Sequence, residues 1–307
     1  MTTHPYGPEA ATLVAVAEDV HAYIQPDGSW CLNNAGLVVG DGRGVLIDTA
    51  ATRARAERLR HEVEKILPGG PGTVVNTHFH GDHHFGNCVF APTASVIAQE
   101  DVREQILRAG LDLQRIWPAV DWGDVRLVAP TLTFRDSLRL HVGELTVELI
   151  DVGPAHTTHD VVAWIPERRV LFCGDVAWAG VTPFCLMGSI EGSLAALATL
   201  RALDAGRIVP GHGPVAGPEV LDDTEEYLRW LQRTALAGHE AGRTPLETAR
   251  ATDLGPFAKL LDAERLVGNL HRAYAELDGR PRGFELDVVG PFQEMAAYHG
   301  RMPDCHA

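Results

Sequence analysis

The segment 77–84 constrains this chain more than any other part of its sequence. It reads T-H-F-H-G-D-H-H and follows a short apolar run typical of a β-strand. Three imidazoles and one carboxylate within six residues suit a divalent metal ion. Because side chains alternate along an extended chain, His78 and His80 face the same side, and the following glycine lets Asp82 and His83 turn toward a second point. The pattern predicts two adjacent metal ions; the alternative is a set of polar residues with structural roles only.

The charge of the chain limits the partners that it can bind. Its 307 residues carry a formal net charge of −15, and 45% of them are hydrophobic, as in ordinary globular proteins. This length indicates one or two domains with a large core. Nucleic acids and anionic membranes attract proteins with clustered lysine and arginine. We therefore expect neither a nucleic-acid-binding protein nor a membrane-surface protein.

The N-terminus and the cysteines bear on where the protein works. Residues 1–11 lack the basic and apolar regions of a signal peptide, and no apolar stretch is long enough for a membrane helix. The five cysteines are scattered, without a C-x-x-C pair, at Cys31, Cys88, Cys173, Cys185 and Cys305. Such spacing is typical of reduced thiols rather than of disulfides or a cysteine-type zinc site. We expect a cytoplasmic protein.

The first half of the chain predicts strands that alternate with helices. Apolar runs separated by turn residues indicate short strands within 12–49, and 53–67 has the periodicity of a helix. A second helix is predicted at 100–109, and a hairpin at 138–150. Ligands that follow strands belong at the end of a sheet. Asp48 closes an early strand, where it either supports the metal loop or caps the next helix.

Three later residues also follow predicted strands. His156 lies in the loop G-P-A-H-T-T-H, and Asp175 comes after a strand and a glycine. His212 has a glycine on each side, which allows the tight turns needed to point its ring into a site. We expect His156 and His212 to be further metal ligands and Asp175 to be able to bridge two ions. His159 is expected either to support a metal ligand from behind or to have a structural role.

The last third of the chain changes character. It contains no dense group of potential ligands, and its apolar periodicity predicts helices that start at Pro218 and at 244–251, 256–275 and 291–299. We therefore divide the chain into a catalytic domain, 1–215, and a helical C-terminal extension, 216–307. The extension is expected to pack against the first domain or to form an interface in a homo-oligomer.

The ligand pattern resembles the metallo-β-lactamase superfamily. The motifs H-x-H-x-D-H, the later histidine, G-D and G-H occur in that order between residues 36 and 215. The resemblance implies an α+β fold, an αββα sandwich with two facing sheets and helices outside. It also implies that the first metal is held by His78, His80 and His156, and the second by Asp82, His83 and His212. Asp175 would bridge the two ions, as in hydrolases similar to glyoxalase II.

A narrower resemblance extends over nearly the whole chain. The segments 28–36, 117–124, 182–188 and 264–271 look like those of metallo-β-lactamase-fold cyclases of aromatic (type II) polyketide biosynthesis, of the actinorhodin-pathway kind. The resemblance implies thioester hydrolysis or cyclisation that releases an aromatic polyketide intermediate from an acyl carrier protein. It places the protein in antibiotic biosynthesis.

A mechanism follows from the metals and the aromatic residues. Two Zn²⁺ ions would activate water for attack on a thioester carbonyl and stabilise the developing oxyanion, although histidine and aspartate also accept iron or manganese. Asp82 would hold a metal, orient the water and take up its proton. A flat pocket for the acyl chain would be formed by five aromatic residues, Trp30, Trp117, Trp122, Trp178 and Phe184. The alternative for each of them is ordinary packing in the hydrophobic core.

Two other functions remain compatible with the sequence. The same site could serve a lactonase or another small thioester or ester hydrolase, such as one acting on glutathione thioesters. Alternatively, the protein could be a non-catalytic subunit that holds metal without turnover. Ligand sets open to water are typical of catalytic rather than structural zinc, which favours an enzyme.

Overall fold

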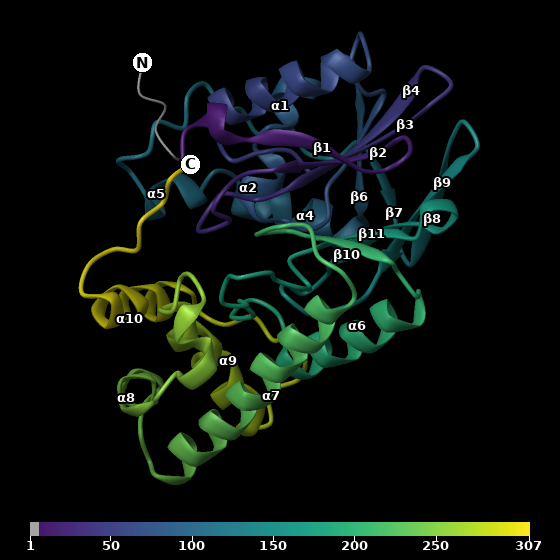
Figure 1. Ribbon diagram of the computed structural model, residues 1–307. Helices are drawn as coiled ribbons and strands as arrows, with labels where there is room; N and C mark the ends of the chain where they lie inside the picture. Colours follow the sequence, from purple (N-terminus) through teal and green to yellow (C-terminus); the bar gives the residue numbers. More distant parts are fainter. Residues whose placement is uncertain (1–5) are drawn as a thin grey trace.

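Two β-sheets form the centre of the molecule. The computed structural model describes residues 6–307, and Figure 1 shows the strands gathered in one half of it. The larger sheet has the strand order β1 (Thr12–Ala17), β2 (Val20–Ile24), β3 (Ala35–Gly40), β4 (Arg43–Ile47), β5 (Thr73–Val75), β6 (Ser95–Gln99), β7 (Leu132–Phe134). The smaller sheet has the order β12 (Arg207–Pro210), β11 (Val170–Gly174), β10 (Val161–Ile165), β9 (Leu145–Asp151), β8 (Ser137–Val142). The predicted early strands and the hairpin are confirmed.

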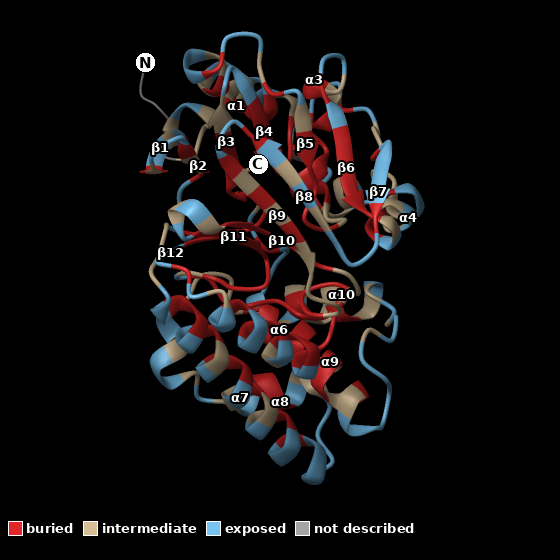
Figure 2. Cartoon of the chain, turned by 90° about the vertical axis from the view of Figure 1, so that its right-hand side faces the viewer, coloured by how far each residue is buried: buried red, intermediate tan, exposed pale blue. Residues whose placement is uncertain are grey.

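The two sheets share one hydrophobic core. Val38 and Ile47 of the larger sheet belong to the same buried cluster as Val147 and Val170 of the smaller sheet. Figure 2 shows the inner strands of both sheets largely buried, whereas β7 at one edge is mostly exposed. Burial of these β-branched side chains on facing sheets is what holds the sandwich together.

Helices cover the outer faces of both sheets. Helix α1 (Arg53–Ile66) begins at Thr52, whose side chain accepts a hydrogen bond from the Arg55 backbone N–H, and buries Leu59 and Val63 against the larger sheet. Helix α6 (Ile190–Ala202) covers the smaller sheet, and Figure 1 places the two helices on opposite sides of the strands. This α+β arrangement of four layers, αββα, is confirmed. Shorter helices lie between strands, namely α2 (Gly81–His84), α3 (Asn87–Phe90), α4 (Glu100–Ala109) and α5 (Leu113–Ile116).

Four helices form the C-terminal part. They are α7 (Glu219–Glu240), α8 (Pro245–Ala251), α9 (Arg265–Leu277) and α10 (Val289–His299). The predicted continuous helix over 256–275 is wrong. Its first residues form a short 3₁₀ helix, Gly255–Lys259, and Leu261 then pairs with Val181 in an isolated β-bridge. The backbone of Asp262 has a positive φ of 57°, which ends this extended piece before α9 begins.

The C-terminal helices join the core beside the smaller sheet. Leu228 of α7, Leu270 of α9 and Met295 of α10 belong to the same buried cluster as Leu171 of β11 and Leu197 of α6. This shared core accounts for the packing of the helices against the sandwich. Among residues 6–307, no helix combines the length and the apolar character needed to cross a membrane.

A buried arginine ties α9 to the sandwich. The side chain of Arg272 is fully buried, and its guanidinium donates hydrogen bonds of 2.7 and 3.0 Å to the carbonyl oxygen of Leu186 and one of 2.8 Å to that of Phe284. These bonds connect α9 to the loop before α6 and to the loop before α10. Removing the guanidinium would leave the two carbonyl groups without donors.

We expect Arg272→Met to lower the free energy of unfolding by about 2–4 kcal/mol, because two buried carbonyl groups lose their charged donor. Denaturant unfolding followed by circular dichroism measures this change. The control is Arg233→Met on the exposed face of α7, which should change stability by about 0.5 kcal/mol or less. Equal stability of the two variants would contradict the structural role of Arg272.

Candidate dinuclear metal centre

The predicted ligands meet at one end of the two sheets. His78 and His80 lie in the loop after β5, and Asp82 and His83 lie in the short helix α2 that follows. The larger sheet therefore supplies four of the seven residues. The smaller sheet supplies the rest from the loop after β9, the end of β11 and the loop after β12, namely His156, Asp175 and His212.

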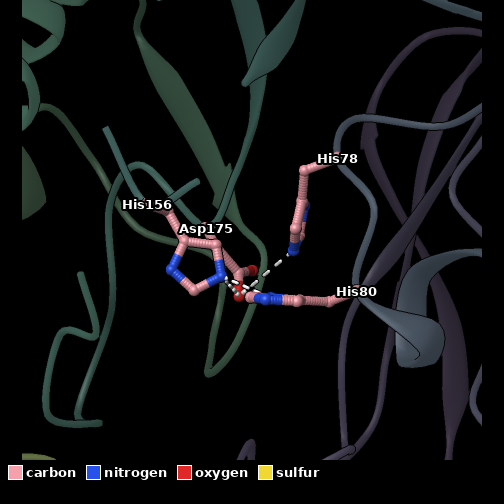
Figure 3. Close-up of side chains that lie close together, drawn as sticks. All are labelled: His78, His80, His156 and Asp175. Atoms are coloured by element: carbon pink, nitrogen blue, oxygen red, sulfur yellow. Dashed lines mark hydrogen bonds and ion pairs between the residues drawn. The ribbon is translucent and has the colours of Figure 1, made fainter. Parts of the chain in front are cut away.

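One group of side chains combines three histidines with the carboxylate of Asp175. The Nδ1 atom of His80 lies 2.8 Å from Nε2 of His156, and Oδ2 of Asp175 lies 3.2 Å from the same Nε2 atom and 3.8 Å from Nε2 of His78. Figure 3 shows the four side chains converging, with His78 and His80 coming from the loop after β5 and His156 and Asp175 from two other segments. One potential ligand atom from each lies within 4.8 Å of all the others.

A second group consists of Asp82, His83 and His212, whose potential ligand atoms also lie within 4.8 Å of one another. The Nε2 atom of His212 is 3.3 Å from Oδ2 of Asp82. Asp175 stands between the two groups, since its Oδ1 is 3.3 Å from Nε2 of His83 and its Oδ2 is 3.6 Å from Nε2 of His212. One carboxylate can therefore serve both groups.

Hydrogen bonds on the far side of each ring fix the orientation of the histidines. The Nδ1 atom of His156 donates to the carbonyl oxygen of Phe184, and that of His212 donates to Gly28 at 2.9 Å. Each of these bonds leaves the Nε2 atom as the acceptor that faces the centre. Such partners set both the tautomer and the direction of a metal-binding imidazole.

Asp48 is the carboxylate that organises the loop after β5. It accepts hydrogen bonds from the backbone N–H and the hydroxyl of Thr77, at 2.8 and 2.7 Å, and lies 2.8 Å from Nδ1 of His83. Because the Thr77 hydroxyl donates its single proton to Asp48, it can only accept from Nδ1 of His78, which lies 3.0 Å away. Asp48 therefore supports the metal loop, and Thr52 caps α1 instead.

Glycines on both sides of His212 are needed for close packing. A Cβ atom on Gly211 would lie only 1.8 Å from Oδ1 of Asp175, and one on Gly213 would lie 1.9 Å from the carbonyl oxygen of Ala179. Gly213 also has a positive φ of 90°. The flanking glycines thus let the His212 loop approach the carboxylate.

The donor set fits two divalent ions. Nε2 of His78 is buried and has no hydrogen-bond partner among the described residues, and Nε2 of His83 and Oδ1 of Asp175, which lie 3.3 Å apart, are buried without forming a hydrogen bond of good geometry. Unpartnered buried polar atoms are rare, and histidine and carboxylate donors are the ligands of zinc and similar ions. Burial lowers the pKa of His78 and of His80, which favours the neutral imidazole that binds a metal.

Asp175 remains ionised in this environment. Burial alone would raise its pKa, but the neighbouring His83, His212 and His156 together hold that pKa well below the usual range. Burial alone would lower the pKa of His83, but the neighbouring carboxylates of Asp175, Asp48 and Asp82 raise it well above the usual value. A divalent ion that binds the His83 ring would displace the proton from the ligating nitrogen.

A cavity of about 720 Å³ opens onto the centre, and His80, Asp82 and His212 form part of its wall. Of the aromatic residues predicted to bind substrate, the structure brings three to this wall, Trp30, Trp178 and Phe184. The size is typical of a pocket for a drug-sized ligand.

The other two predicted tryptophans lie behind the cavity wall. Trp117 contacts Trp30 with ring centroids 5.4 Å apart, and its Nε1 donates to the carbonyl oxygen of Pro303 at 2.8 Å. Trp122 donates in turn to the carbonyl oxygen of Trp117 at 3.1 Å. Neither belongs to the residues that line the cavity, so both support the wall from outside.

The C-terminal helices contribute cavity residues that we did not single out from the sequence. Arg265 at the start of α9 and Phe292 of α10 both line the cavity. Arg265 lies within the segment 264–271, but an arginine in a helical pattern gives no sign that it will be buried. Only the fold shows that this helix reaches the metal centre.

The chain belongs to the metallo-β-lactamase superfamily, since the family model of that superfamily matches residues 28–212. A solved metallo-β-lactamase from Pontibacter korlensis has the same fold, with a TM-score of 0.59, 21% sequence identity and coverage of 71% of this chain and 99% of that one. This is a superfamily of hydrolases, and the histidines and aspartates described above form a possible metal-binding site within its fold.

Three characterised relatives indicate the range of the superfamily. The chain is 26% identical to linear primary-alkylsulfatase from a Pseudomonas species over 69% of this chain and 48% of that protein. It is 31% identical to hydroxyacylglutathione hydrolase from Methylococcus capsulatus over 54% and 55% of the two chains. It is 25% identical to the acyl-coenzyme A thioesterase MBLAC2 from Homo sapiens over 61% of this chain and 75% of that protein. The matched parts span only about half the length of the first two relatives.

We expect Asp48→Asn to weaken zinc binding about 10–100-fold, because the amide cannot keep the same contacts to both Thr77 and His83. Competition with a chromogenic chelator measures the affinity. The matched control is Asp41→Asn in the exposed turn after β3, which should bind zinc like the wild type. Unchanged affinity in both variants would show that Asp48 does not orient the ligands.

Proposed function

We propose that the protein is a dinuclear zinc hydrolase that cleaves a thioester of an aromatic acyl group. The natural substrate would be an aromatic polyketide intermediate on an acyl carrier protein in the cytoplasm, released by hydrolysis or ring closure. The observation that carries this proposal is the aromatic cavity of about 720 Å³ that ends at the metal-binding residues. The acyl-coenzyme A thioesterase and the hydroxyacylglutathione hydrolase among the relatives support the choice of an acyl thioester.

The residues around the centre would have two roles in the reaction, to hold the metal ions and to orient water. The two groups of histidines and aspartates described above would hold two divalent ions, which would lower the pKa of bound water and polarise the thioester carbonyl. The buried carboxylate of Asp82 lines the cavity and can orient the attacking water by accepting its hydrogen bond. A thiolate is a good leaving group, so the reaction requires no strong general acid.

The cavity walls would bind the acyl group. The rings of Trp30 and Phe184 pack edge to face with their centroids 5.3 Å apart, and the ring centroid of Phe292 lies 5.9 Å from that of Trp30. These rings form an apolar surface beside the candidate metal ligands that suits a flat, conjugated acyl chain. At the cavity mouth, the exposed Arg115 pairs with Asp112 of the same chain at 3.1 Å. An acidic carrier protein would have to compete with Asp112 for this arginine.

The first experiment combines elemental analysis with the hydrolysis of 2-naphthoyl-N-acetylcysteamine, a soluble aromatic thioester. We expect about two zinc ions per chain and thioester cleavage that chelation abolishes and added zinc restores. A parallel panel of lactones and glutathione thioesters tests a lactonase or a small-thioester hydrolase. Two metals with cleavage of lactones alone would overturn the thioester assignment, and two metals with no cleavage would favour a non-catalytic metal-holding subunit.

We expect Asp82→Asn to lower kcat for the aromatic thioester by about 100-fold or more, because the amide no longer orients the water as a carboxylate does. Steady-state kinetics with zinc-loaded protein measures the change, and elemental analysis shows whether metal is retained. Asp41→Asn in the exposed turn after β3, away from the cavity, is the control and should keep kcat within about twofold. A fully active Asp82→Asn variant would remove this residue from the mechanism.

A further inference from the structure

Two consecutive charged residues at the start of α9 meet the tryptophans of the cavity wall. Glu264 is the N-cap residue of the helix and Arg265 is its first residue. Both side chains are almost fully buried, with 3% and 1% of their surfaces exposed. Charged residues are seldom buried without a specific partner, so this pair requires an explanation beyond the packing of the helix.

Glu264 fixes the ring of Trp30. Its Oε1 accepts a hydrogen bond of 2.6 Å from Nε1 of Trp30, 234 residues earlier in the chain. A hydrogen bond to a carboxylate is stronger than one between neutral groups, so the indole is held at its polar end. Trp30 therefore presents a fixed face to the cavity.

Arg265 packs against the tryptophans rather than forming a full set of hydrogen bonds. The carbon atom of its guanidinium lies 4.1 Å from the ring centroid of Trp30 and 4.8 Å from that of Trp178. It pairs with Asp262 at 2.9 Å and donates to the carbonyl oxygen of Thr182 at 3.1 Å, while its Nε has no partner among the described residues. Contacts with the two tryptophan rings therefore make up much of the environment of the Arg265 guanidinium.

The stack continues to the metal centre. Trp178 lies nearly parallel to His212, with ring centroids 5.1 Å apart and an angle of 18° between the rings. Arg265, Trp178 and His212 therefore form a continuous series from the C-terminal helices to a metal-binding residue. A ligand in the cavity would meet this rigid aromatic wall directly beside the reacting atoms.

We propose that Glu264 and Arg265 are positioning residues that determine substrate specificity. They hold Trp30 and Trp178 as a rigid wall, and this wall selects flat aromatic acyl groups over flexible aliphatic ones. A rigid wall favours a flat ligand because stacking then costs little side-chain entropy, whereas a flexible chain gains less from a fixed surface. This inference rests on the proposed thioester hydrolysis but is also testable by binding alone.

A second buried arginine of the same helix provides the matched control. Arg272 is also buried in α9, but it binds backbone carbonyl groups and does not line the cavity. A purely structural role of Arg265 predicts that Arg265→Met and Arg272→Met affect all substrates alike. A role in specificity predicts that only Arg265→Met changes the preference between substrates.

The experiment compares 2-naphthoyl- and octanoyl-N-acetylcysteamine as substrates of the zinc-loaded full-length protein and its variants. We expect Arg265→Met to raise KM for the aromatic thioester about tenfold, with kcat within about twofold and little change for the octanoyl thioester. Glu264→Leu should act in the same direction, whereas Glu264→Gln keeps an acceptor oxygen for Trp30 and should retain the wild-type preference. Elemental analysis and circular dichroism check that metal content and fold are retained.

The outcomes separate this inference from the proposed function. An unchanged preference in Arg265→Met, or the same loss in Arg272→Met, would overturn the positioning role even if the wild type hydrolyses thioesters. If the wild type cleaves neither thioester, the proposed function fails, and calorimetric titration with 2-naphthoate and octanoate still tests the wall. The inference is supported if the wild type binds naphthoate more tightly than octanoate and only Arg265→Met and Glu264→Leu lose this difference. Equal binding of the two acids by the wild type would overturn it.

Discussion

The carboxylate of Asp175 is the group on which the arrangement of the site depends. It lies between histidines from both sheets, 3.2 Å from His156 and 3.3 Å from His83. A buried carboxylate among imidazoles is costly unless positive charge compensates for it. Two divalent ions would provide that charge, and the glycine at 211 keeps the space for the carboxylate open. The loops of the sandwich therefore form around a polar centre that metal would complete.

The C-terminal helices matter for function as well as for packing. They share a core with the outer face of the smaller sheet, and they bring Arg265 and Phe292 to the cavity beside the metal centre. The sandwich supplies the candidate metal ligands, and the helices supply part of the cavity wall beside them. This division separates the chemistry, which the superfamily shares, from substrate recognition, which varies among the relatives.

Periodicity and turn residues report local structure, so they predicted the early strands, the hairpin, α1 and α4 correctly, whereas the layered α+β fold was implied by the resemblance to the superfamily. The helix predicted over 256–275 failed because Leu261 pairs with Val181, a contact between distant segments that periodicity does not record. Trp117 and Trp122 show a similar limit. An aromatic residue has the same local pattern whether it lines a cavity or supports the wall from behind, and in this fold both lie behind it.

The sequence by itself determined the seven polar residues that come together, because their spacing relative to strands and glycines is local information, and the order of these motifs implied the superfamily and its layered fold by resemblance. Only the tertiary structure decided which residues surround them. Asp48 reaches His83 across 35 positions, and Glu264 reaches Trp30 across 234. Such contacts depend on how the sheets and C-terminal helices pack, and burial of a charged side chain is a property of that packing rather than of its neighbours in sequence.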